Sequence, residues 1–171
     1  MTVKGSKLYW AKVKPNATIP TKEKENAGYD IYPCFDEDYI IIRPHYTKLI
    51  PTGIACAVRD CYYLQVQERG STGSKGIKYG AGVIDSGYRG EIFIAITNTN
   101  ELPVIIAKDI NMAEIDAIIK ETNAIVYPYE KAIAQLIVHN VIDMNEEEIS
   151  YEELQNIPSR RGTGMLGSSG K

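Results

Sequence analysis

Glycines surround one carboxylate and one phenol in the segment YGAGVIDSGYRGEIF, residues 79–93. The acid is Asp85 and the phenol is Tyr88. The glycines are Gly80, Gly82, Gly87 and Gly90. A carboxylate in such a loop can take a proton from water as a general base, and glycines let a backbone approach a ligand closely. Because a lone acid in a tight hairpin can equally cap a turn, its chemistry depends on what accompanies it.

Two other glycine-rich segments combine arginine with serine, ERGSTGSKG at 68–76 and RRGTGMLGSSG at 160–170. Backbone amides, hydroxyls and guanidinium groups are the donors that hold phosphates. Neither segment has the Gly-Lys-Ser/Thr of the phosphate loop in nucleotide-hydrolysing α/β proteins. One such segment alone is typical of a flexible loop. Two in a chain with an acid-bearing hairpin indicate a site for a phosphorylated ligand.

The elements that must position these segments have a period of two. Short apolar or alternating runs predict strands at 7–13, 39–44, 47–58, 62–69, 90–98, 103–108 and 133–142. Many short strands separated by Gly and Pro turns indicate an all-β sandwich or closed barrel. We therefore expect the three glycine-rich segments to be loops on a β scaffold.

Residues 111–122, NMAEIDAIIKET, have helical rather than strand periodicity. Their apolar residues recur three or four apart, at Met112, Ile115, Ile118 and Ile119. Asn111 followed by Glu114 predicts a capping box at the start of this helix. Near the end of the chain, the acidic run 145–154 and the Gly- and Ser-rich residues after it predict a tail that does not pack by itself.

Length and composition favour one soluble, intracellular domain. The 171 residues suit a single domain, and the formal net charge of −3 argues against broad nucleic-acid binding. The cysteines are odd in number and form no Cys-x-x-Cys pair, which predicts reduced thiols and a cytoplasmic protein. They are Cys34, Cys56 and Cys61. We expect no secretory leader and no membrane span, because no run approaches about 20 apolar residues.

Five segments, taken in order, resemble the motifs of the homotrimeric deoxyuridine triphosphate nucleotidohydrolases, the dUTPases. They are AGYDIY (27–32), ERGSTGSKG, GVIDSGYRGE (82–91), KAIAQLI (131–137) and RRGTGMLGSSG. The resemblance implies a jelly-roll-like β-barrel over residues 1–157 and a flexible arm, 158–171, that closes the active site. It also implies that three subunits build three sites at their interfaces and hydrolyse dUTP to dUMP and pyrophosphate.

The same resemblance assigns roles to the central hairpin. Asp85 would be the general base that activates water for attack on the α-phosphorus. Tyr88 would lie beneath the deoxyribose and leave no room for a ribose 2′-hydroxyl. Main-chain groups around Gly82 and Ile84 would read the uracil edge and exclude other bases.

Further residues would bind the triphosphate. Arg69, Gly70 and Ser71 would contact the phosphates, and Gln135 would reach the substrate from a neighbouring strand. Residues of the closing arm would clamp the distal phosphates, and these are Arg161, Leu166, Gly167, Ser168 and Ser169. Mg²⁺ would be bound mainly through triphosphate oxygens and waters, with Asp30 acting indirectly through water.

The chain departs from the family pattern at the second, fourth and last motifs. In the fourth, Tyr129-Glu130-Lys131 stands where Gly-Asp-Arg/Lys is common, a change of turn chemistry more than of catalysis. The second motif reads Arg69-Gly70-Ser71 where the family has Arg-Ser, so the hydroxyl has moved by one residue or its task falls to backbone N–H groups. In the last motif Leu166 stands where the family has an aromatic residue that stacks on uracil. Because leucine lacks a ring face, we expect a weaker lid and a higher KM.

The helix-bearing segment, about 105–128, resembles an insertion between the third and fourth motifs, which suggests a phage-type member and the cytoplasm of a host cell. We expect it to pack its apolar face on the barrel, with a docking surface for a regulatory protein as the alternative. Two other functions stay open: a dUTP-binding sensor, and a dCTP deaminase of the same fold. The deaminase is disfavoured because Ala95 stands where its catalytic glutamate would be.

Overall fold

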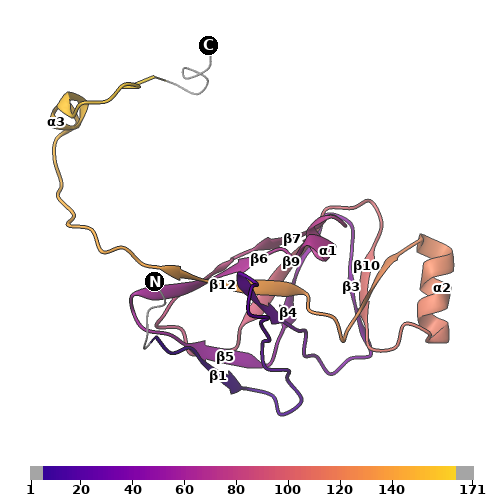
Figure 1. The fold of residues 1–171 in the computed structure, drawn as a ribbon. Helices are drawn as coiled ribbons and strands as arrows, with labels where there is room; N and C mark the ends of the chain where they lie inside the picture. Colours follow the sequence, from indigo (N-terminus) through magenta and orange to yellow (C-terminus); the bar gives the residue numbers. More distant parts are fainter. Residues whose placement is uncertain (1–5, 165–171) are drawn as a thin grey trace. The chain divides into compact units, whose positions relative to one another are not determined.

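The computed structural model describes residues 6–164 (Figure 1). The chain divides into two compact units, Met1–Val141 and Ile142–Lys171. The first unit contains all of the strands found in the described residues, together with helices α1 (Gly70–Gly73) and α2 (Ala113–Thr122). The second contains the short helix α3 (Tyr151–Asn156).

Strands dominate the first unit, which confirms the all-β expectation. They are β1 (Tyr9–Lys12), β2 (Gly28–Ile31), β3 (Tyr39–Ile42), β4 (Thr47–Pro51), β5 (Ile54–Ala57), β6 (Tyr62–Gln67), β7 (Ile77–Gly80), β8 (Val83–Ile84), β9 (Phe93–Asn98), β10 (Val104–Ala107), β11 (Ile125–Pro128) and β12 (Ala134–Asn140). Every run expected to be a strand contains one, and the run 47–58 contains two. No alternating run predicted β2, β7, β8 and β11, which are short and mostly begin or end at glycine or proline.

The strands form four small sheets. Their orders are β1-β5, β2-β12-β6-β8, β4-β9-β7 and β11-β10-β3. Alternation along β12 turns Ala134 and Leu136 into the core and leaves Gln135 between them on the opposite face. Buried residues from all four sheets meet in one hydrophobic core. The site-bearing loops are therefore mounted on a single packed scaffold.

Helix α2 packs as expected. It connects β10 to β11, which pair in parallel, and lies beside the β11-β10-β3 sheet (Figure 1). Ile115 is fully buried with Ile105 and Ala107 of the adjoining strand region, and Ile118 and Ile119 pack against this second cluster. Helix α2 and the strands beside it thus have a small hydrophobic core of their own.

The expected capping box of α2 is wrong. The N-cap residue is Met112, whose side chain makes no capping bond, and Asn111 lies one residue further out. The Glu114 carboxylate instead accepts a 2.6 Å hydrogen bond from the Tyr39 hydroxyl. The Glu114 carboxylate, which the local pattern assigned to the helix end, therefore binds Tyr39 of β3 instead.

The second unit contains a helix that was not expected. Ser150 caps α3 by accepting a hydrogen bond from the Glu153 N–H, and the Glu153 carboxylate accepts one from the Ser150 N–H. This Ser-x-x-Glu pattern is a capping box that lies within the acidic run of the sequence. Within residues 6–164, no helix has the length and apolar character to cross a membrane.

Candidate active site

The hairpin that follows β8 presents Asp85 to solvent. β8 pairs with β6 through Ile84 and Leu64, which fixes the strand that leads into the turn. The Tyr88 N–H donates to the Asp85 carbonyl oxygen at 3.1 Å and closes the turn. Asp85 is exposed directly after buried Ile84, so its carboxylate lies at the surface while its backbone is anchored.

Two of the hairpin glycines are closely approached by side chains that would have to move if a Cβ were present. A Cβ on Gly90 would lie 2.5 Å from the Tyr88 hydroxyl oxygen, and a Cβ on Gly82 would lie 2.6 Å from Gln65 Nε2. A Cβ on Gly80 or Gly87 would meet no atom within 4 Å. Gly90 therefore lets the Tyr88 ring fold back over the chain, where its hydroxyl donates to the Glu91 carbonyl oxygen at 2.8 Å.

Main-chain groups of the hairpin are partly used within the fold. The Gly82 carbonyl oxygen accepts a 2.7 Å hydrogen bond from the Val66 N–H. A carbonyl oxygen has a second lone pair, so this bond does not exhaust its capacity. The hairpin is therefore attached to β6 at two points, through the backbone of Gly82 and through the pairing of Ile84 with Leu64.

A first hollow of about 240 Å³ surrounds this turn. Ile84, Asp85 and Tyr88 line it, as expected of one site. The structure adds lining residues to which the motifs had assigned no role, among them Leu49, Glu91 and Phe93. Leu49 and Phe93 are 60% and 44% exposed although both are large and apolar. Strand alternation makes them face outward, but only the pairing of β4 with β9 brings them to the hairpin.

A second hollow, of about 390 Å³, gathers the other expected residues of the folded domain except Gly82, which lines neither hollow. Asn26, Ala27, Asp30, Arg69, Gly70, Ser71 and Gln135 line it. Asp30 and Gln135 are direct partners in the β2–β12 register, and Gln135 also faces Gln67 of β6. The α1 turn supplies Gly70 and Ser71 at the end of β6. Residues from three motifs therefore meet here.

An ion pair organises the second hollow. Arg69 Nε and Nη2 donate to the two carboxylate oxygens of Asp30 at 2.9 and 3.0 Å, and Nη1 donates to the Ala132 carbonyl oxygen at 3.1 Å. Burial acts to lower the pKa of Arg69, but the Asp30 carboxylate outweighs it and raises that pKa. Of the five guanidinium N–H groups, two lie outside these three bonds.

The α1 turn contains two hydroxyl groups with different surroundings, those of Ser71 and Thr72. Thr72 is buried, and its hydroxyl accepts from the Arg69 N–H at 3.2 Å and donates to the Arg69 carbonyl oxygen at 3.1 Å. Ser71 is exposed and lines the hollow. Gln135 is held in turn by a 2.7 Å hydrogen bond from its Nε2 to the Glu68 carbonyl oxygen. The sequence did not distinguish Thr72 as the structural hydroxyl.

The two hollows share no lining residue. The structure brings Asp30, Arg69, Gly70, Ser71 and Gln135 together in one and Ile84, Asp85 and Tyr88 in the other. Arg161 belongs to the second unit, where its Nε donates to the Gly164 carbonyl oxygen at 3.2 Å. The expected arm residues Leu166, Gly167, Ser168 and Ser169 lie outside the described residues.

One carboxylate of the second hollow is placed to meet a solvent molecule or a bound ligand. Among residues 6–164, no group of three or more His, Cys, Asp or Glu side chains is placed to hold a metal ion. Asp30 is the carboxylate that lines the second hollow, and each of its oxygens keeps a lone pair beyond the bond from Arg69. Asp30 can therefore accept a hydrogen bond from a metal-bound water.

Known proteins match the chain over most of its length. A family model described as dUTPase matches residues 15–119. The deoxyuridine 5′-triphosphate nucleotidohydrolase of Candida albicans is 35% identical over 159 residues, which cover 92% of this chain and 84% of that protein. The protein of the same name from Nautilia profundicola is 33% identical and is covered over 99% of its length, with 96% of this chain.

Solved structures agree on the fold. The dUTPase of Staphylococcus bacteriophage 80alpha with dUpNHpp has a TM-score of 0.72 at 22% identity, covering 96% of this chain and 99% of that chain. The EIAV dUTPase has a TM-score of 0.60 at 23% identity, covering 85% and 98%. These likenesses confirm the jelly-roll-like fold. Because the family model spans more than half of the chain and the sequence relatives exceed 30% identity over nearly its whole length, the chain belongs to the dUTPase family.

Proposed function

We propose that this chain hydrolyses dUTP to dUMP and pyrophosphate. The observation that carries the proposal is the exposed Asp85 carboxylate, fixed on a turn beside the folded-back ring of Tyr88. One acid with access to solvent can activate a water, and one ring beside it can serve as the floor of a sugar site. Membership of the dUTPase family supplies the substrate class.

Asp85 accepts a proton from the attacking water, which is directed at the α-phosphorus. Tyr88 lies beneath the deoxyribose and leaves no space for a 2′-hydroxyl. The backbone near Gly82 and Ile84 reads the uracil edge. Because these main-chain groups are anchored to β6, their positions are set before substrate binds, which favours selectivity.

The second hollow receives the phosphates. Arg69, Ser71 and the Gly70 backbone contact them, and Gln135 reaches the substrate from β12. The arm 158–171 closes over the site through Arg161, Leu166, Gly167, Ser168 and Ser169 and excludes water. Mg²⁺ would be held by the triphosphate and, through water, by Asp30, and it would supply charge neutralisation for the leaving pyrophosphate.

The separation of the two hollows supports a trimer with shared sites. A single chain holds the base and sugar residues in one hollow and the phosphate residues in another, with no residue in common. In a closed ring of three copies, the first hollow of one subunit can face the second hollow of its neighbour. We place this assembly in the cytoplasm, or in the host cytoplasm for a phage-encoded chain.

A regulatory partner at the insertion is a second proposal with a defined surface. The apolar face of α2 is packed on the sheet, so a partner would meet the other face, where Asp116, Lys120 and Glu121 are exposed. A sensor of dUTP would use the same substrate site without turnover. The two functions differ in whether pyrophosphate is released.

The test is pyrophosphate release from dUTP with Mg²⁺, with dCTP, dTTP and UTP as alternative substrates. Each nucleotide is assayed separately, and we expect release from dUTP only. Asp85→Asn should reduce kcat by at least about a thousandfold, because the water loses its base. Asp116→Asn, which removes an exposed acid on α2, is the matched control and should retain wild-type turnover. Tight dUTP binding without release from any nucleotide would instead favour the sensor.

A further inference from the structure

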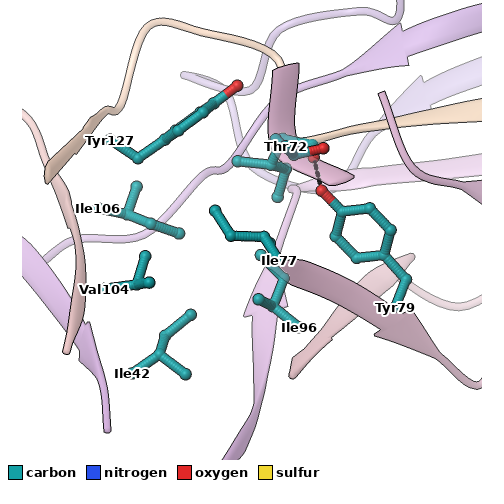
Figure 2. A pocket seen from close by; sticks show the side chains of 9 residues that line it. Ile42, Thr72, Ile77, Tyr79, Ile96, Val104, Ile106 and Tyr127 are labelled. Atoms are coloured by element: carbon teal, nitrogen blue, oxygen red, sulfur yellow. Dashed lines mark hydrogen bonds between the residues drawn. The ribbon is translucent and has the colours of Figure 1, made fainter. Parts of the chain in front are cut away.

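Two tyrosines behind the second hollow direct their hydroxyls at the same short stretch of backbone. Tyr79 of β7 and Tyr127 of β11 line a cavity of about 10 Å³ among apolar side chains and Thr72 (Figure 2). A space of this size holds at most about one water, so it is no ligand site. The polar ends of the two rings therefore matter for what they hold in place.

Both hydroxyls bind consecutive carbonyl groups. Tyr127 donates to the Ala132 carbonyl oxygen at 2.7 Å. Tyr79 donates to the Ile133 carbonyl oxygen, and Figure 2 shows this bond as a dashed line at the Tyr79 hydroxyl. The Ala132 oxygen is the same atom that accepts Arg69 Nη1 at 3.1 Å. These two residues lead directly into β12, on which Gln135 lies.

We propose that Tyr79 and Tyr127 are positioning residues for the triphosphate: they fix the backbone at Ala132 and Ile133, which orients Arg69 and sets the place of Gln135. This inference rests on the proposed function. Neither tyrosine lines the second hollow, so both act through other residues. Tyr127 ends the inserted segment, which links the insertion to the phosphate side of the site.

The bonding pattern favours positioning over simple packing. A carbonyl oxygen accepts two hydrogen bonds, and Ala132 receives one from Tyr127 and one from Arg69 while its residue is buried. Loss of either donor leaves a buried acceptor short of a partner and frees Arg69 to move. Burial raises the pKa of the Tyr79 phenol, so this hydroxyl remains a donor at any working pH.

The test replaces each hydroxyl by hydrogen and keeps the ring. Tyr79→Phe and Tyr127→Phe are compared with Tyr39→Phe, a matched control whose lost hydroxyl bonds Glu114 in the insertion. Titration calorimetry measures binding of dUpNHpp and of deoxyuridine to each full-length protein. We expect dUpNHpp affinity to fall about three- to tenfold in the two test variants while deoxyuridine affinity stays within about twofold.

The split between the two ligands separates positioning from damage to the fold. The same variants should raise KM for dUTP more than they lower kcat, and the Tyr39→Phe protein should match the wild type in all of these. Unchanged dUpNHpp affinity in both test variants, or an equal loss for both ligands, overturns the inference alone. A wild type that fails to bind dUpNHpp overturns the proposed function and this inference together.

Discussion

At the scale of single residues, Gly90 decides where the Tyr88 ring can lie. The ring folds over the chain and its hydroxyl reaches the Glu91 carbonyl oxygen, a placement that leaves no room for a side chain at position 90. Gly87, only three residues away, faces open space. The abundance of glycine in this hairpin therefore has different causes at different positions.

Gly90→Ala is expected to weaken selection for the deoxyribose. The new methyl group would displace the Tyr88 ring, whose atoms lie as near as 2.5 Å, and the ring can swing outward at little cost to the fold. We expect the preference for dUTP over UTP, measured as a ratio of kcat/KM values, to fall about fivefold or more. Gly87→Ala is the control and should keep the wild-type ratio, and an unchanged ratio in both variants would contradict this account of Tyr88.

At the scale of elements, different interactions stabilise the helices α2 and α3. α2 has no side-chain cap and is held by a fully buried Ile115 and by packing on β10. α3 has no buried residue and depends on the reciprocal bonds between Ser150 and Glu153. A helix held only by local bonds is sensitive to the charge of the groups that form them.

The α3 helix is expected to unwind in acid. Hydrogen bonds from the Ser150 hydroxyl and backbone lower the pKa of Glu153. Because the folded pKa is below the unfolded one, the stabilisation is complete above the ordinary glutamate value of about 4.3 and is lost as pH falls through the lower, folded pKa. Cα chemical shifts of residues 151–156 in the full-length protein, followed from pH 7 downward, should lose their helical character in that range.

Two variants make this measurement specific. Ser150→Ala should lose the helical shifts already at neutral pH, because the cap is gone. Glu148→Gln changes a nearby acid that takes no part in the cap and should follow the wild-type pH profile. Helical shifts in the wild type that persist well below the folded pKa would show that the capping box does not hold α3.

At the scale of the whole molecule, the division of the expected site between two hollows is the main feature. Asp85 and Arg69 lie in different hollows of one chain. If the functional site joins the first hollow of one subunit to the second hollow of another, two chains with different defects can complete each other. A site built within one chain cannot be rescued in this way.

Mixing two inactive variants therefore tests the shared site. Asp85→Asn and Arg69→Ala proteins, unfolded together in equal amounts and refolded, should regain about a quarter of the wild-type activity, since each site draws one residue from each of two randomly chosen subunits. Each variant refolded alone is the control and should stay inactive. Sedimentation equilibrium should give three times the 19.0 kDa chain mass, and absence of recovery in mixtures of that mass would contradict sharing.

Much of this molecule follows from the sequence alone. The period-two runs predicted the strands, and the spacing of Met112, Ile115 and Ile119 predicted α2, because side-chain direction along a regular element is set by local geometry. The order of the five motifs identified the family, which the comparisons confirm. The cap of α3 is also a local pattern, since Ser150 and Glu153 are three residues apart.

The tertiary structure alone decided which polar groups meet. The pairing of Arg69 with Asp30 joins residues far apart in the chain. The hydroxyls of Tyr79 and Tyr127 bind the backbone carbonyl groups of residues 132 and 133, next to this ion pair. Glu114 bonds Tyr39 instead of capping its own helix. Strand register and sheet packing determine which of these distant groups come into contact. Neither can be predicted from the residues next to each group in the sequence.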